Sequence, residues 1–207
     1  ESYRWANSIF DITQRTNWLL ADMAFRNVQD RARFLQTEFA TNLLQLTKDS
    51  EQVRLVEDRD GDHRADHSEV FANGFNSIVD GTAAGILAYG TNLWFANIPN
   101  LTRLSLEPAS APGETPDNST PKPTPTPRGN ASRTDLATGF GVHIGVSGHD
   151  LHGLIRGPDG RIYMSIGDRG LSITNREGLI LNLPDCGSVL RCEPDGSGFE
   201  VFAHGLR

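Results

Sequence analysis

One short strand motif occurs twice in this chain. "EVFANGFN" at 69–76 returns as "EVFAHGLR" at 200–207. Each copy follows an apolar run and an acidic turn that contains glycine, "VRLVEDRDGDHRADHS" in the first case and "SVLRCEPDGSGF" in the second. Two further stretches correspond, "GILAYGTNLWFANI" and "GLIRGPDGRIYMSI". Repeated units of this kind bury their apolar faces by stacking on one another, so the repeat predicts a fold of stacked, strand-rich units.

The spacing of the repeat favours a β-propeller. Four-stranded units of about 40 to 50 residues are the sequence signature of propeller blades. Each "EVFAxG" strand would be the outer strand of one blade and lead into the next. The copies begin 131 residues apart and an insertion lies between them, so two blades fit the interval better than one. We therefore expect an all-β fold, a partial β-propeller with an incomplete set of four-stranded blades. Because two or three blades cannot close a ring, we expect it to be a fragment of a larger propeller.

The first 50 residues have a different pattern. Apolar side chains recur at steps of three and four from Val28 to Leu46, which predicts one amphipathic helix, preceded by a shorter one around Trp18 to Phe25. From Val53 onward, turn residues separate short apolar or alternating runs, which predicts strands. These are 53–56, 69–72, 85–89, 93–98, 154–156, 161–166, 188–192 and 199–203. We expect an N-terminal helical segment, 1–50, that precedes or is inserted in a propeller domain, 51–207.

Composition narrows the organisation further. Residues 107–133 hold seven of the 11 prolines and are expected to form a disordered loop rather than a packed core.

The two cysteines are expected to be free thiols. A straight strand between Cys186 and Cys192 would separate their Cα atoms by about 20 Å at ~3.3 Å per residue, which is too far for a disulfide.

Charge and hydropathy exclude two classes of partner. The formal net charge is -7 and no basic cluster offsets it, which argues against nucleic-acid binding. The sequence contains no run of 18 apolar residues, so no membrane span is predicted. No signal peptide is recognised at the start of the sequence.

The first candidate site is an acidic run. Carboxylates stand at positions 1, 3, 5, 9 and 12 of a twelve-residue stretch, as in calcium-binding loops. Position 6, where such loops carry glycine, is His63, and no helix is predicted on either side. A calcium site and a solvated acidic hairpin turn therefore both stay open. The candidate metal ligands are Asp58, Asp60, Asp62, Asp66 and Glu69.

Histidines supply the other candidates. His143, His149 and His152 have an H-x5-H-x2-H spacing, which allows either a metal site or separately packed side chains. In a hairpin formed by 154–156 and 161–166, the residues just before the first strand and just after the second lie close together, which places His149 near Asp168. A carboxylate beside an imidazole fixes its tautomer and makes it a better base. The alternative is a hydrogen bond that only ties off the hairpin.

Residues 149–170, "HDLHGLIRGPDGRIYMSIGDRG", closely resemble the propeller of soluble quinoprotein glucose dehydrogenases and the wider glucose/sorbosone dehydrogenase family. The shared pattern is a histidine, a Gly-Pro-Asp-Gly turn, an aromatic strand and Gly-Asp. The separation of His149 and Asp168 matches that of the family's catalytic pair. Residues 50–207, apart from the proline-rich insertion, also resemble the N-terminal propeller of large dehydrogenase-like proteins of planctomycetes and verrucomicrobia. In those proteins HEAT-like repeats and a cytochrome c domain with a CxxCH motif follow.

The resemblance implies oxidation of a sugar or related alcohol with pyrroloquinoline quinone (PQQ). His149 would take the hydroxyl proton, Asp168 would hold that base, and Arg207 would contact the quinone. It also implies calcium as a further cofactor, electron transfer to a haem domain outside this chain, and a periplasmic or secreted setting. Two departures are Gly148, where the family has an acidic residue, and His152, where glycine is common.

Two other function classes stay open. A non-catalytic propeller that binds glycans or partner proteins would keep the same hairpin for stability alone. A zinc or calcium hydrolase built on a propeller would lose its activity to chelators and would not respond to quinone.

Overall fold

The computed structural model describes residues 15–105, 131–144 and 148–206. This part of the chain is mostly β-structure, as predicted, with helices only near the N-terminal end. Most of the predicted proline-rich loop lies outside the described residues. Its predicted C-terminal boundary was wrong, because Ser132 and Arg133 already belong to a strand that pairs in a sheet.

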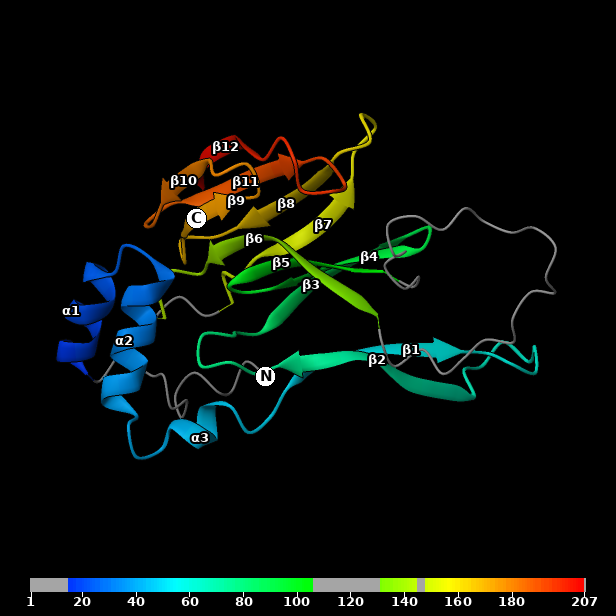
Figure 1. Cartoon of the computed structure of the whole chain (residues 1–207), viewed down its shortest axis with the longest axis horizontal. Coiled ribbons are helices and arrows are strands. Elements are labelled where there is room, and N and C mark those ends of the chain that lie inside the picture. Colours follow the sequence, from blue (N-terminus) through cyan, green and yellow to red (C-terminus); the bar gives the residue numbers. More distant parts are fainter. Residues whose placement is uncertain (1–14, 106–130, 145–147, 207) are drawn as a thin grey trace, which may run out of the picture.

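The helices are α1 (Thr16–Ala24), α2 (Val28–Glu38) and α3 (Leu43–Leu46), and they lie together at one end of the molecule (Figure 1). The prediction of one helix from Val28 to Leu46 was wrong. The Phe39 backbone N–H still donates to the Leu35 carbonyl, but Phe39 then accepts from the Asn42 N–H at 2.7 Å in a turn. Threonine and asparagine follow at 41 and 42, and their side chains compete for backbone hydrogen bonds, which favours a helix end there.

The strands form a two-stranded and a ten-stranded sheet. Their bounds are β1 (Glu51–Glu57), β2 (His67–Phe75), β3 (Ala83–Tyr89), β4 (Asn92–Asn97), β5 (Asn100–Ser105), β6 (Ser132–Phe140), β7 (His152–Arg156), β8 (Ile162–Ile166), β9 (Leu171–Asn175), β10 (Ile180–Leu183), β11 (Gly187–Cys192) and β12 (Glu200–Leu206). All eight predicted strands are present. The sequence patterns missed β5, β6, β9 and β10.

Two antiparallel meanders make up most of the larger sheet. Strands β3-β4-β5-β6 form the first and β7-β8-β11-β12 the second. Their first strands meet in a parallel bridge between Ala84 and His152. This bridge joins the two meanders into one sheet. The β9–β10 hairpin, which lies between β8 and β11 in sequence, pairs with β6 at the outer edge of the first meander. The β1–β2 ribbon lies apart from this sheet (Figure 1).

The sequence repeat is also a structural repeat. Its two copies form β2 and β12, and each is the second strand of an antiparallel hairpin, β1–β2 or β11–β12. In both hairpins the register slips by one residue at the phenylalanine of the motif, Phe71 in β2 and Phe202 in β12. The glycine three residues later has a positive φ in both copies, 79° at Gly74 and 85° at Gly205. The copies therefore share a β-bulge as well as a sequence.

The main core lies between the two meanders. Buried side chains from β4, β5 and β6 pack against those from β7, β8, β9 and β11. Trp94 is 3% exposed, and its indole N–H donates to the Pro194 carbonyl at 3.0 Å, which links β4 to the β11–β12 turn. The Phe140 and Phe199 rings also meet across the two meanders, with centroids 6.2 Å apart. The two meanders are thus held together mainly by the burial of apolar surface between them.

Two smaller cores attach the other elements. Trp18, Phe25 and Leu35 of the helical segment pack on Val142 and Ile144, which follow β6. The β1–β2 ribbon packs on β4 and β5 through a separate cluster of Val53, Phe71, Phe75, Phe95 and Leu104. None of the described helices combines the length and apolar character that crossing a bilayer requires.

Both cysteines are free thiols, as predicted. Cys192 is fully buried, and burial raises the pKa of its thiol to about 12. This side chain therefore acts as a small apolar group of the core and not as a nucleophile.

Gly139 lies where β6 approaches β9 closely, so a substitution at this residue tests the packing of the two strands. Its φ is +124°, and a Cβ there would lie 2.0 Å from the Ser172 carbonyl oxygen, whereas a Cβ at Gly90 (φ +61°) would meet nothing within 4 Å. We expect Gly90→Ala to lower the free energy of unfolding by about 1 kcal/mol through backbone strain alone. Gly139→Ala adds a clash with backbone, so we expect a loss of about 3 kcal/mol or more. Urea unfolding measures both, and equal losses would contradict the β6–β9 packing.

Candidate functional site

The β7–β8 hairpin brings two loops to one end of the second meander. Its turn is closed by a 2.8 Å hydrogen bond from the Gly157 N–H to the Arg161 carbonyl. At the other end, the loop before β7 meets a turn after β8 that is closed by Gly170 N–H and the Gly167 carbonyl at 3.1 Å. The Gly167 N–H also donates to the His149 carbonyl at 3.1 Å. The predicted proximity of the two strand ends is therefore confirmed.

His149 and Asp168 are joined by a short hydrogen bond between Nδ1 and Oδ1. Because a carboxylate only accepts, Nδ1 carries the proton in the neutral imidazole and Nε2 is left as an acceptor. The side chains are 41% and 27% exposed, and Nε2 has no hydrogen bond to any residue that the structure describes. The pair thus leaves Nε2 as a hydrogen-bond acceptor on a partly exposed side chain, while its catalytic role stays a prediction.

A second pair lies one residue further along both loops. Asp150 and Arg169 form a short ion pair between Oδ1 and Nη1, with side chains only 3% and 8% exposed. The Arg169 Nε–H also donates to the His143 carbonyl at 2.7 Å, and the His143 N–H donates to the Arg169 carbonyl at 3.0 Å. Sequence reasoning missed this pair. Its signal was available, since Asp150 and Arg169 have the same separation of 19 residues as His149 and Asp168.

His143 belongs to a different contact, between α1 and the sheet. Its Nδ1 lies 2.8 Å from the Asp22 carbonyl oxygen and its Nε2 lies 3.0 Å from Asp185 Oδ1. Burial by itself disfavours the charged imidazole, but hydrogen bonds and the charge of Asp22, helped by Asp185, outweigh burial and raise the pKa of His143 above its ordinary 6.5. His143 is therefore a structural histidine.

The three histidines do not form a metal site. His152 lies on β7, where its Nδ1 is 3.2 Å from the Ser165 hydroxyl, and each of the other two has its own carboxylate. Within residues 15–105, 131–144 and 148–206, the potential metal ligands that converge in a group of three or more are Asp58, Asp60 and Asp62. The three-histidine hypothesis was wrong because the loop before β7 sends each imidazole to a different partner.

The acidic run forms the exposed turn between β1 and β2. Carboxylate oxygens of Asp58, Asp60 and Asp62 lie within 4.8 Å of one another. Asp58 accepts from the backbone N–H groups of Gly61 at 2.7 Å and of His63 at 2.8 Å, which shapes the turn. His63 has a φ of +69° in place of a glycine. Both sequence hypotheses are compatible with this turn, and calcium binding stays a prediction.

Two predicted members of the acidic run are absent from the cluster. Asp66 Oδ1 accepts from the Arg59 N–H at 3.0 Å, so it closes the turn. Glu69 lies within β2, beside His67 at 3.6 Å. The β-ladder begins at His67 and carries Glu69 away from the turn, so only part of the twelve-residue spacing is realised.

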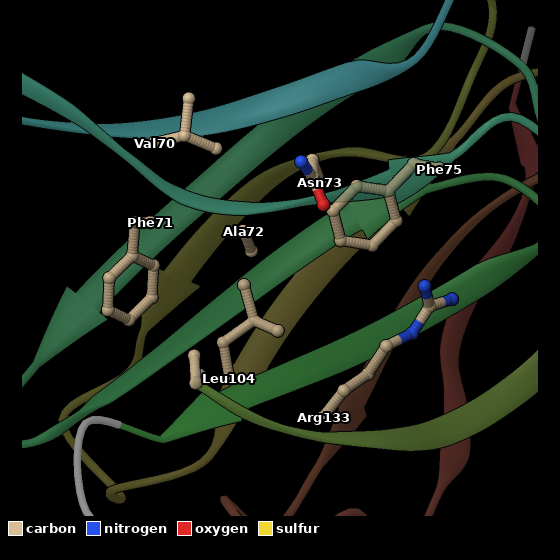
Figure 2. Close-up of a pocket in the computed structure, with 8 residues that line it drawn as sticks. Val70, Phe71, Ala72, Asn73, Phe75, Leu104 and Arg133 are labelled. Carbon is tan, nitrogen blue, oxygen red and sulfur yellow. The ribbon is translucent and has the colours of Figure 1, made fainter. Parts of the chain in front are cut away.

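Arg207 lies outside the described residues. Figure 2 shows a pocket between β2 and the β5–β6 region, where the Arg133 guanidinium lies near the Phe75 ring, with its Cζ 4.5 Å from the ring centroid. Its lining, which is mostly apolar, is Val70, Phe71, Ala72, Asn73, Phe75, Leu104, Ala131 and Arg133. None of these residues belongs to the β7–β8 hairpin, so we interpret the pocket as a gap in packing.

Comparisons with protein-family models, curated proteins and solved structures gave no match. The function is therefore argued from the geometry of this site.

His143 gives a pH dependence with a defined sign. Because its pKa is raised in the folded state, its contribution to stability is complete below the unfolded value of 6.5 and is lost as pH rises through the higher folded value. We expect the free energy of unfolding to fall with rising pH in this window, and His143→Gln to remove that part of the fall. Urea unfolding across a pH series measures this, with His152→Gln as the control. An unchanged slope in His143→Gln would contradict the assignment.

Proposed function

We propose that this chain is part of a dehydrogenase that oxidises a hydroxyl group of a sugar or related alcohol, with His149 as the general base. The observation that carries the proposal is the His149–Asp168 pair, which fixes the imidazole through Nδ1 on a side chain that is 41% exposed. The resemblance of residues 149–170 to quinoprotein sugar dehydrogenases supports the substrate class.

The pair fits the proton-accepting half of such a reaction. Oxidation of an alcohol to a carbonyl removes a proton from oxygen and a hydride from carbon. His149 Nε2 accepts the hydroxyl proton, and the Asp168 carboxylate, bonded to the Nδ1–H, stabilises the imidazolium that forms. The hydride leaves with its two electrons to an acceptor, which the resemblance implies is PQQ.

The described residues do not by themselves form a site for an anionic quinone. Arg169 is the cation next to the pair, but its guanidinium is buried and bound to Asp150 and the His143 carbonyl. Arg207, the contact that the resemblance implies, lies outside the described residues. We therefore assign no step to the quinone. Calcium, transfer of electrons to a haem domain and a periplasmic or secreted setting likewise follow from the resemblance alone.

We further propose that the two meanders are blades of a partial β-propeller. Three observations support this interpretation. Each meander has four antiparallel strands, their first strands run parallel to each other, and the β1–β2 ribbon repeats the bulged outer hairpin β11–β12. The pairings of β3 with β7 and of β9 with β6 are departures, because propeller blades pack face to face without joining their edges.

The test is dye reduction by the complete protein over a panel of sugars, with and without added PQQ and calcium. We expect PQQ-dependent turnover that falls at least about 100-fold in His149→Gln, because removing a general base typically costs this much. His152→Gln is the matched control, since that imidazole lies on the same hairpin and its Nδ1 lies 3.2 Å from the Ser165 hydroxyl instead of a carboxylate.

Two results would overturn the proposal. Full turnover in His149→Gln would remove the base from the mechanism. A folded wild-type protein that neither binds PQQ nor reduces dye would favour the non-catalytic alternative, and a glycan-binding screen would then follow.

A further inference from the structure

We propose that Asp150 and Arg169 are positioning residues that hold His149 in its Nδ1–H tautomer against Asp168. This inference rests on the proposed function for its catalytic consequence, but the positioning itself is observable without turnover. It concerns two buried residues that would act through His149.

The argument begins with the pairing of two dipeptides. His149-Asp150 on one loop faces Asp168-Arg169 on the other, and both pairs have the same separation in sequence. Consecutive side chains point to opposite sides, so the outer pair is partly exposed while the inner pair is buried. A shift of one loop by a single residue would break both pairs at once. The inner pair therefore fixes the register in which the outer pair can form.

Arg169 ties this register to the backbone at His143 directly and at Gly148 through Asp150. Its guanidinium binds Asp150 through Nη1 and the His143 carbonyl through Nε. Asp150 in turn accepts from the Gly148 N–H at 3.3 Å, which restrains the residue before His149. A planar guanidinium makes such directed bonds simultaneously, which a lysine ammonium at one point cannot do.

There is little room for the imidazole to adapt. A Cβ at position 167 would lie 2.6 Å from the His149 Cβ, so only glycine allows the two loops to approach this closely. A small displacement of either loop would change the distance and angle between Nδ1 and the Asp168 carboxylate. Hydrogen bonds weaken steeply with poor angles, so the tautomer depends on this fit.

Stability alone does not explain a buried ion pair here. Apolar side chains of similar volume commonly stabilise a fold as well or better than a buried ion pair does. Arg31 on α2, itself 2% exposed, also lies in this region, and its pKa is lowered to about 9 by burial and by the charge of Arg169. Placing two arginines together in the interior costs stability. The geometry that the directed bonds of Arg169 impose on the two loops explains why the ion pair is present despite this cost in stability.

The experiment is two-dimensional ¹H–¹⁵N NMR of the histidine side chains, which reports which ring nitrogen carries the proton. In the wild type we expect the Nδ1–H tautomer at His149 in the neutral form. In the charge-neutral double variant Asp150→Asn/Arg169→Gln we expect a mixture with the Nε2–H tautomer. Arg169→Lys keeps the buried charge without the directed bonds and serves if the double variant does not fold. The expected result for it is a smaller shift in the same direction.

Arg176→Gln is the matched control. This arginine binds the Asp195 carbonyl on the far side of β9–β10, so its loss should leave the tautomer of His149 unchanged. His152 provides an internal control within every spectrum, because its Nδ1 partner is Ser165. In the dye-reduction assay we expect kcat of the Arg169 variants to fall about 10- to 100-fold with little change in KM, as misplaced catalytic groups do.

The outcomes separate the two proposals. A pure Nδ1–H tautomer in folded Arg169 variants would overturn the positioning role, whatever the activity. A tautomer shift without turnover in the wild type would support positioning and overturn the dehydrogenase proposal. A fall in kcat with the tautomer unchanged would mean that Arg169 acts by another route, which also overturns the positioning role.

Discussion

The contact between Arg169 and the His143 backbone is the constraint on which the rest of the structure depends. It joins the turn after β8 to the segment that follows β6, and so connects the second meander to the first. The same His143 carries the contact onward to α1 through Asp22. Helices, sheet and candidate site thus meet at one buried polar junction. Removing a charged group from water costs free energy unless hydrogen bonds and an opposite charge replace its hydration. The junction therefore tolerates few alternative arrangements.

Polar and apolar contacts contribute differently to the stability and to the specificity of this fold. Apolar burial between the meanders supplies most of the driving force, and it is non-directional. The polar junction adds direction, because its hydrogen bonds specify which loop faces which. A site that needs an imidazole at a fixed angle benefits from lying beside such a junction rather than in the middle of an apolar core.

The sequence was informative where periodicity or turn chemistry is strong. The hairpin of 154–156 and 161–166 was predicted with the correct partners, and its geometry alone brought His149 to Asp168. Strand β6 was missed because Ser132–Phe140 is polar and follows the proline-rich stretch. The equal spacing of Asp150 and Arg169 was readable in the sequence, but which of the two pairs is buried required knowing which side of each loop faces the interior. That side is decided by the packing of distant elements, which periodicity within the hairpin does not encode.

The shared bulge of β2 and β12 separates local from tertiary causes. Phe71 and Phe202 occupy the same place in the bulge, yet Phe71 is 5% exposed and Phe202 57% exposed. Burial of the aromatic ring therefore does not create the irregularity. The irregularity instead accompanies what the two hairpins share, their sequence and the positive φ of Gly74 and Gly205, so the bent hairpin is a local motif that the fold uses once against its interior and once at its surface.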